Sequence, residues 1–181
     1  MMTINRPSTL FTLLGGFMLS MSLHSAQAAD EYVSHYTSLK HKDCINLDDG
    51  HEYSVEQCPA FDAYEVRLIF ADLRQSLTLA KNGQEYPLDF YTTVSGGFSR
   101  MGDVLEWRFQ ETDKAPKLRA LITRFSVEDQ PDSDKATSYL VVAKVTPDEV
   151  CVVGKIPPVK KQNEKARIMA DKADTLPCIK P

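Results

Sequence analysis

Two segments of this chain alternate between apolar and polar residues, which is the pattern of a β-strand with one buried face. In the first, 64–70, every second residue from Tyr64 onward is apolar. The core-facing residues of the second, 103–110, are Leu105, Trp107 and Phe109. Strands with one apolar and one polar face are typical of an antiparallel sheet. The alternation therefore predicts a mainly β domain.

Further segments extend this pattern and are separated by turn residues. Asn82-Gly83 is a favoured hairpin turn, and Gly96-Gly97 interrupts the strand pattern. The additional strands that we expect are 75–80, 88–94, 118–125, 137–145 and 150–155. We expect 118–125 to be buried on both faces. The segment 32–47 reads as irregular, with a short helical turn near 34–39.

The pattern changes after Pro157-Pro158, where helix-forming residues begin. Asn163 is the expected N-cap, and the apolar stripe of the helix consists of Ala166, Met169, Ala170 and Ala173. We therefore predict an α+β, mainly β fold. It has an antiparallel sheet or sandwich of about six to eight strands and one C-terminal helix at about 160–174. Because strands and helices do not alternate, a parallel α/β fold is disfavoured.

The N-terminus has the layout of a secretory signal peptide. Arg6 is followed by an apolar run of 14 residues, 10–23, and by the small-x-small sequence Ala26-Gln27-Ala28. We expect cleavage after residue 28, which leaves one domain at 29–181; an uncleaved anchor is the alternative. No later run is long enough to span a membrane. The predicted location is periplasmic or secreted.

Composition and charge limit the classes of partner. The chain has 181 residues, 43% of them hydrophobic, and a net charge of −4. Removing residues 1–28 takes away one arginine and no acid, so 153 residues with a charge of −5 remain. A chain of this size can build a core of its own. An acidic domain is a poor candidate for nucleic-acid binding, and we expect no nucleic-acid partner.

Four cysteines remain after cleavage: Cys44, Cys58, Cys151 and Cys178. An even number in an exported chain is typical of disulfides. Three pairings exist, and we favour Cys44–Cys58 with Cys151–Cys178 because these residues are nearest in sequence. The alternatives are a metal site and a redox-active pair, but the C-x-x-C spacing is absent.

The three histidines of the mature chain are close together near its N-terminus, and acidic residues lie beside them. The residues of this segment are His35, His41, Asp43, Asp48, Asp49, His51 and Glu52. Imidazole and carboxylate groups can bind zinc or copper. However, no two histidines have the H-x-x-x-H spacing, and 48–50 does not match an EF-hand loop. We predict no metal ligands and no cofactor.

No catalytic motif emerges from the remaining residues. The serines of 95–99 do not form the G-x-S-x-G motif, and the histidines lie far from them in sequence. Glu65 and Glu106 are a pair of outward carboxylates of the kind that glycosidases use. Arg67 and Arg108 share their faces, and cross-strand ion pairing explains all four residues more simply. We therefore predict no catalytic residues.

The glycine-rich segment 95–102 is the predicted interaction loop. Its candidate contact residues are Phe98, Arg100 and Met101, because aromatic residues and arginine are enriched at binding hot spots. The alternative is a simple hairpin connection with Phe98 folded onto the core. The Gly-Lys-Ser/Thr sequence of a phosphate-binding loop is absent.

Several short motifs resemble landmarks of an uncharacterised family of small, exported proteobacterial proteins with four cysteines. They are Tyr36-Thr37-Ser38-Leu39, Cys58-Pro59, Ala71-Asp72-Leu73-Arg74, Leu105-Glu106-Trp107-Arg108, Cys151-Val152-Val153-Gly154 and Ala170-Asp171 before Cys178. The resemblance implies no activity and no catalytic residues. The chain departs from the family at 60–63, where glycines are expected.

The leading functional hypothesis is an exported, non-catalytic binding or interaction protein of the bacterial envelope. One version is an inhibitor that presents 95–102 to an enzyme of the envelope or of a host. A metal-binding protein or hydrolase that uses the N-terminal His/Asp segment is the first alternative. A structural envelope component that pairs through a sheet edge is the second.

Overall fold

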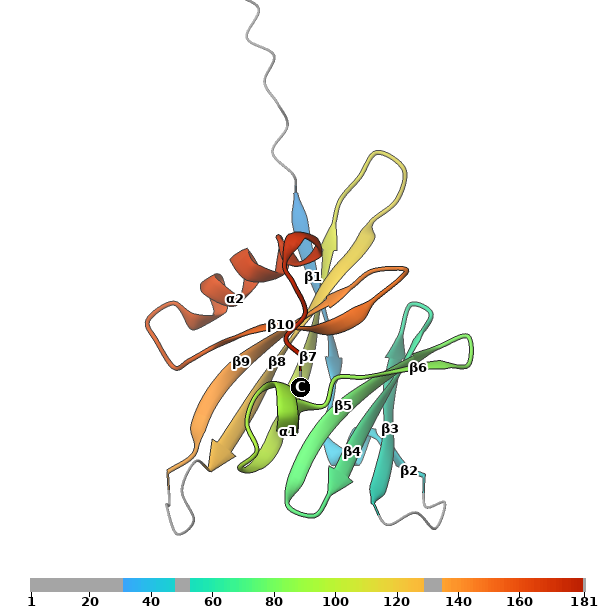
Figure 1. Ribbon diagram of the computed structural model, residues 1–181. Coiled ribbons are helices and arrows are strands. Elements are labelled where there is room, and N and C mark those ends of the chain that lie inside the picture. Colours follow the sequence, from blue (N-terminus) through green and yellow to red (C-terminus); the bar gives the residue numbers. More distant parts are fainter. Residues whose placement is uncertain (1–30, 48–52, 129–134, 181) are drawn as a thin grey trace, which may run out of the picture.

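The computed structural model describes residues 31–47, 53–128 and 135–180. These residues form two five-stranded antiparallel sheets that face each other, with one main helix near the C-terminus (Figure 1). The predicted mainly β fold is therefore confirmed. The ten strands exceed the expected six to eight because short strands add to the sheet edges.

Sheet A has the order β1-β7-β8-β9-β10. Its strands are β1 (Tyr32–Ser38), β7 (Phe98–Gln110), β8 (Lys117–Glu128), β9 (Thr137–Val145) and β10 (Val150–Ile156). The N-terminal strand β1 pairs with β7 along its whole length. The prediction of an irregular segment at 32–47 was thus wrong. Tyr32–Ser38 gains regular structure by pairing with a strand about 70 positions later in sequence, and local sequence does not reveal such a partner.

Sheet B has the order β2-β3-β4-β5-β6. Its strands are β2 (Ile45–Asn46), β3 (Ser54–Phe61), β4 (Tyr64–Ala71), β5 (Arg74–Lys81) and β6 (Gln84–Pro87). The turn at Asn82-Gly83 has φ values of 53° and 79°, as a type I′ hairpin requires. The predicted strand at 88–94 was wrong. After β6 the chain forms the short helix α1 (Phe90–Thr93), because Leu88 and Phe90 turn into the core.

The main core lies between the two sheets. Its largest fully buried side chains include Trp107, Phe90, Phe125, Leu77 and Leu79, which come from both sheets and from α1. β5 approaches β7, β1 approaches β3, and β10 approaches β6. The two sheets therefore form a flattened, barrel-like sandwich, whose inward faces carry the apolar residues expected from the alternation.

A second, smaller core lies between the outer face of sheet A and helix α2 (Gln162–Ala170) (Figure 1). Ala166, Ala170 and Ala173 are fully buried there against Ile122 and Val142. This confirms the predicted stripe, and it explains why 118–125 is buried on both faces. The residue before the helix is Lys161, in the left-handed conformation (φ 63°), so Asn163 is not the N-cap.

Both predicted disulfides are present. Cys44 is bonded to Cys58 beside β2 and β3, and Cys151 on β10 is bonded to Cys178 near the C-terminus. Such bonds are typical of proteins that fold outside the reducing cytoplasm. The structure includes two 3-10 turns, η1 (His41–Asp43) and η2 (Ala173–Thr175).

Within the described part of the chain, no helix is both long and apolar enough to cross a membrane.

Candidate binding site

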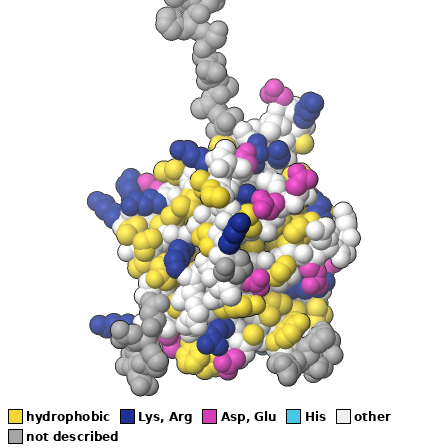
Figure 2. Space-filling view, in the orientation of Figure 1, with side chains coloured by type: hydrophobic (Ala, Val, Ile, Leu, Met, Phe, Trp, Pro, Cys, Tyr) yellow, Lys and Arg dark blue, Asp and Glu magenta, His cyan; other side chains and the backbone are white. Residues whose placement is uncertain are grey.

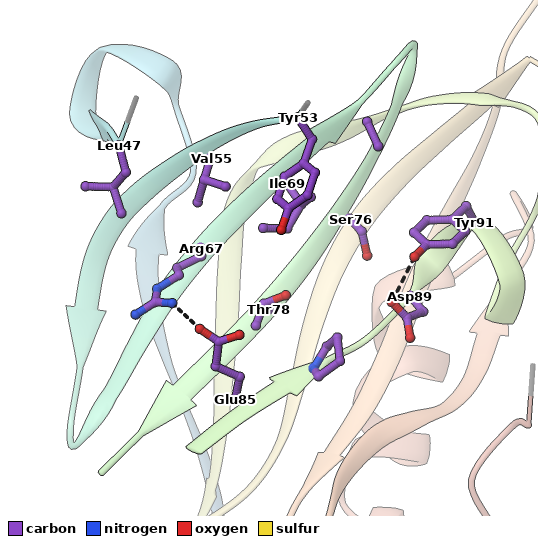
Figure 3. A pocket seen from close by; sticks show the side chains of 12 residues that line it. Leu47, Tyr53, Val55, Arg67, Ile69, Ser76, Thr78, Glu85, Asp89 and Tyr91 are labelled. Carbon is purple, nitrogen blue, oxygen red and sulfur yellow. Dashed lines mark hydrogen bonds and ion pairs between the residues drawn. The ribbon is translucent and has the colours of Figure 1, made fainter. Parts of the chain in front are cut away.

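A pocket of about 480 Å³ lies on the outer face of sheet B, away from the main core. We call it the sheet B pocket. Its lining residues are Leu47, Tyr53, Val55, Arg67, Ile69, Ala71, Ser76, Thr78, Glu85, Pro87, Asp89 and Tyr91 (Figure 3). Its volume falls within the range of about 300–1,000 Å³ that is typical of small-molecule sites.

Strand register brings the floor of the pocket together. Arg67 is opposite Thr78, Ile69 is opposite Ser76, and Val55 is opposite Ile69. These residues alternate with the core-facing Val66, Leu68, Leu77 and Leu79, so they point outward. Val55, Ser76 and Thr78 are nevertheless buried. The outer face of sheet B is therefore partly covered at this place.

Segments at both ends of the floor make the walls. Leu47 lies at one end, Asp89 and Tyr91 of the α1 segment lie at the other, and Tyr53 lies between them over Ile69 (Figure 3). The chain can turn into α1 because Asp89 adopts the left-handed conformation (φ 44°), which Asp tolerates better than most residues. The backbone N–H of Phe90 then donates to Oγ of Ser76 at 3.0 Å, which fixes α1 to β5.

An ion-pair cluster occupies one side of the pocket. The guanidinium of Arg67 donates to Oε2 of Glu65 at 2.8 Å and also to Glu85. Its hydrogen bond to Glu65 is the main cause that raises the pKa of Arg67 above its ordinary value, and burial opposes this. Both terminal nitrogens of Arg67 are thus held by carboxylates, and its charge is already compensated.

A second polar pair lies on the opposite side. The hydroxyl of Tyr91 donates to Oδ1 of Asp89 at 3.2 Å. Burial raises the pKa of Tyr91 above its usual value, and the charge and hydrogen bond of Asp89 add to this effect. The hydrogen bond leaves the second carboxylate oxygen of Asp89 for another donor.

Thr78 lies between these two pairs, at the centre of the floor (Figure 3). It is only 7% exposed, but the buried polar atom of this pocket that has no hydrogen-bond partner among the described residues is Nε of Arg67. A buried N–H donor without a partner costs free energy. A ligand that supplies an acceptor would recover that cost.

The electrostatic character of the molecule is mixed outside this pocket. On the face seen in Figure 2, Lys and Arg side chains are interspersed with Asp and Glu, and hydrophobic side chains lie between them. The pocket itself combines one guanidinium with three nearby carboxylates, those of Glu65, Glu85 and Asp89. Its described charged groups are therefore net negative.

The predicted interaction residues occupy a different place. Phe98, Arg100 and Met101 belong to β7 and pair with β8, so the prediction of a free loop at 95–102 was wrong. The structural reason is the close approach of Gly97 to the backbone of Glu128, which lets strand pairing start early. Phe98 is partly exposed beneath the guanidinium of Arg74, and Met101 packs against the main core.

The histidines do not come together with a common set of ligands in the described chain. His35 packs between the rings of Phe61 and Phe109, whereas His41 contacts the buried carboxylate of Glu56. The other residues of the proposed His/Asp segment (Asp48, Asp49, His51 and Glu52) lie outside the described residues. Glu149, Cys151 and Cys178 also cluster, but the two cysteines form a disulfide.

Sequence reasoning did not identify the sheet B pocket. Alternation placed Arg67 on an outward face, but its ion pair with Glu65 lies along one strand, β4, instead of across strands as expected. The signals that could have been followed were the hydroxyl residues Ser76 and Thr78 at alternate positions of the same strand. The α1 segment borders the pocket beside Ser76, and that segment was predicted to be a strand.

No protein-family model matches the sequence, and neither a curated protein nor a solved structure shows significant similarity to the chain.

Proposed function

We propose that this chain is an exported, non-catalytic binding protein of the bacterial envelope and that it holds its ligand in the sheet B pocket. The observation that carries the proposal is the buried Nε of Arg67, which has no hydrogen-bond partner among the described residues and lines a hollow of about 480 Å³. Apolar walls with a few converging polar groups are the usual composition of a ligand site.

The proposed location rests on the leader sequence and the disulfides. Export as a periplasmic or secreted protein predicts that the N-terminal residue of the mature chain is Ala29. It also predicts that both disulfides are formed. Intact-mass analysis of the protein purified from the periplasm and from the medium tests this. Uncleaved chain that stays in the cytoplasm with four free thiols would contradict the location.

Ligand binding can be tested without knowing the ligand. Native mass spectrometry of protein incubated with envelope extract is expected to show a bound small molecule. The substitution Thr78→Trp places a large ring in the pocket and is expected to abolish the added mass. Ile168→Trp is a matched control, because Ile168 is an exposed residue on α2, away from the pocket. Equal ligand mass in both variants would overturn the assignment of the site.

The edge around Phe98 remains a second candidate surface for a protein partner of the envelope or of a host. Leu73 and Phe98 are both exposed there, and the backbone of Ser99 donates to the carbonyl of Leu73 at 2.9 Å. A shallow hollow that includes Arg100 lies beside them. Pull-down from envelope or host extract with Phe98→Ala and Arg100→Ala tests this candidate. Unchanged capture would remove it.

A further inference from the structure

We infer that the sheet B pocket takes a neutral polyhydroxylated ligand, that is, a saccharide. This inference rests on the proposed binding function and names the chemical class of its ligand. Three features of the pocket support it: a hydrogen-bond donor without a partner, a surplus of carboxylates around that donor, and two tyrosine rings beside these polar groups.

The first feature is a donor on Arg67 that lacks an acceptor. The terminal nitrogens of its guanidinium donate to Glu65 and Glu85, but the N–H at Nε is buried and has no hydrogen-bond partner among the described residues. A buried donor without an acceptor costs free energy. A ligand oxygen that accepts from Nε would recover this cost, whereas an ammonium group has only donors. The pocket therefore favours a ligand that supplies an acceptor.

The second feature is the surplus of carboxylates around this donor. Glu65 and Glu85 already compensate the positive charge of Arg67, and Asp89 adds a further carboxylate to the lining. An incoming carboxylate or phosphate would bring another negative charge close to these groups, and like charges repel. A neutral hydroxyl, ether or carbonyl oxygen can accept from Nε without this repulsion. The acceptor that the pocket favours is therefore uncharged.

The opposite side of the pocket suits a hydroxyl that donates. The hydroxyl of Tyr91 donates to Oδ1 of Asp89 at 3.2 Å, which leaves Oδ2 for another donor. Thr78 lies on the floor between Arg67 and Asp89 (Figure 3). Each hydroxyl can both donate and accept a hydrogen bond. A polyol can therefore accept from Arg67 at one side of the pocket and donate to Asp89 at the other.

The third feature is the pair of tyrosine rings on the lining. Tyr53 and Tyr91 are 43% and 39% exposed. Tyr53 lies over Ile69, and Tyr91 lies beside Asp89 (Figure 3). The face of an aromatic ring carries partial negative charge and attracts polarised hydrogens, and a sugar ring presents C–H groups on its faces. Rings beside hydroxyl-binding groups thus favour a saccharide over a small acyclic acceptor.

The test is a titration of the purified protein, followed by amide NMR shifts. The probes are the neutral methyl glycosides of glucose, galactose, mannose and N-acetylglucosamine. We expect at least one of them to give saturable shifts at residues 67–69, 76–78 and 89–91. The methyl glycoside of glucuronate, which is an anion, and hexylammonium, which is a cation, are expected to bind less tightly than that sugar. No saturable shift with any neutral glycoside, or tighter binding of either ion, would overturn the inference.

Two variants connect binding to the named groups. Arg67→Lys keeps the positive charge but has a carbon in place of Nε, and it is expected to weaken binding of the tightest glycoside by about tenfold. Asp89→Asn keeps a residue that tolerates the left-handed conformation and is expected to weaken binding by about threefold.

The matched control is Arg119→Lys, because Arg119 lies on β8 of sheet A, outside the pocket. We expect it to leave the affinity unchanged. Full affinity in Arg67→Lys, or an equal loss in Arg119→Lys, would overturn the assignment. If Arg67→Lys does not fold, Asp89→Asn replaces it in this comparison, and full affinity in that variant has the same consequence.

A comparison of chain lengths distinguishes the source of the saccharide. Tighter binding of the tetrasaccharide of the preferred sugar than of its methyl glycoside indicates a glycan, whereas equal binding indicates a free sugar. Failure of all four neutral glycosides overturns the chemical class. The proposed binding function would then still stand if envelope extract supplied a ligand that Thr78→Trp excludes. It would fall with the class if no such ligand appeared.

Discussion

Nε of Arg167 on helix α2 donates to Oε1 of Glu106 on strand β7 at 2.7 Å, across 61 residues of sequence. The hydrogen bond to Glu106 is the main cause that raises the pKa of Arg167, and burial opposes this. Alternation predicted Glu106 to face solvent, but α2 covers this face and leaves only 12% of the side chain exposed.

Arg108 is paired in the same way with Asp171 after the helix, with Nε 2.6 Å from Oδ1. The cross-strand pairing expected for Glu106 and Arg108 was therefore wrong, and ion pairs attach the helix to the sheet.

Removing the Glu106–Arg167 pair is expected to weaken the attachment of α2. Because Arg167 is about one-third exposed, solvent screens part of the interaction, and Arg167→Ala should lower the free energy of unfolding by about 1–2 kcal/mol. Urea denaturation measures this. Lys165→Ala on the same helix is the control, because Lys165 is exposed, and it should change stability by less than about 0.5 kcal/mol. Equal losses in the two variants would contradict a specific pair.

The neighbouring glycines before β7 should respond differently to alanine. A Cβ at Gly97 would lie 2.6 Å from the carbonyl oxygen of Glu128, whereas a Cβ at Gly96 would meet nothing closer than 3.7 Å. We expect Gly97→Ala to destabilise the protein by about 1–3 kcal/mol, because the backbone must shift. Gly96→Ala should be neutral or slightly stabilising. Thermal unfolding compares the two variants, and similar melting temperatures would argue against the close approach of β7 and β8.

The Cys151–Cys178 disulfide should contribute substantially to stability. It closes a segment of 27 residues, for which the chain-entropy relation gives about 3.5 kcal/mol. The double substitution Cys151→Ser and Cys178→Ser is expected to lower the denaturation midpoint in urea accordingly. Adding reductant to the double variant should then break the remaining Cys44–Cys58 bond. The free energy of unfolding should fall by about a further 3 kcal/mol, for a segment of 14 residues. An unchanged midpoint in the double variant would contradict the prediction.

Tyr91 should titrate later than an ordinary tyrosine. Its pKa is raised in the folded state, so its contribution to stability is complete below the unfolded pKa of about 10 and is lost as pH rises through the folded pKa. Absorbance of tyrosinate, compared between the native chain and Tyr91→Phe, isolates this group. Asp89→Asn should lower the pKa of Tyr91 but leave the part caused by burial. No change on Asp89→Asn would contradict the role of Asp89.

The sequence alone determined the strands that alternate, the C-terminal helical stripe and the disulfide pairing. Each of these depends on local information. Leu105, Trp107 and Phe109 are apolar at every second position of a strand. Ala166 and Ala170 are about one helical turn apart. The disulfides join the cysteines that are nearest to each other in sequence. In such cases the pattern of buried residues is set by the period of the element itself.

The tertiary structure decided what each face meets. Tyr32–Ser38 became a strand because β7 was available beside it, and Phe90 entered the core instead of extending a sheet. Glu106 was covered by a helix that follows it by more than 50 residues. Ser76, which points outward from sheet B, was contacted by the backbone of Phe90 in α1. Alternation specifies that two faces differ, but burial of the polar face depends on long-range packing. The sheet B pocket was therefore visible only in the folded chain.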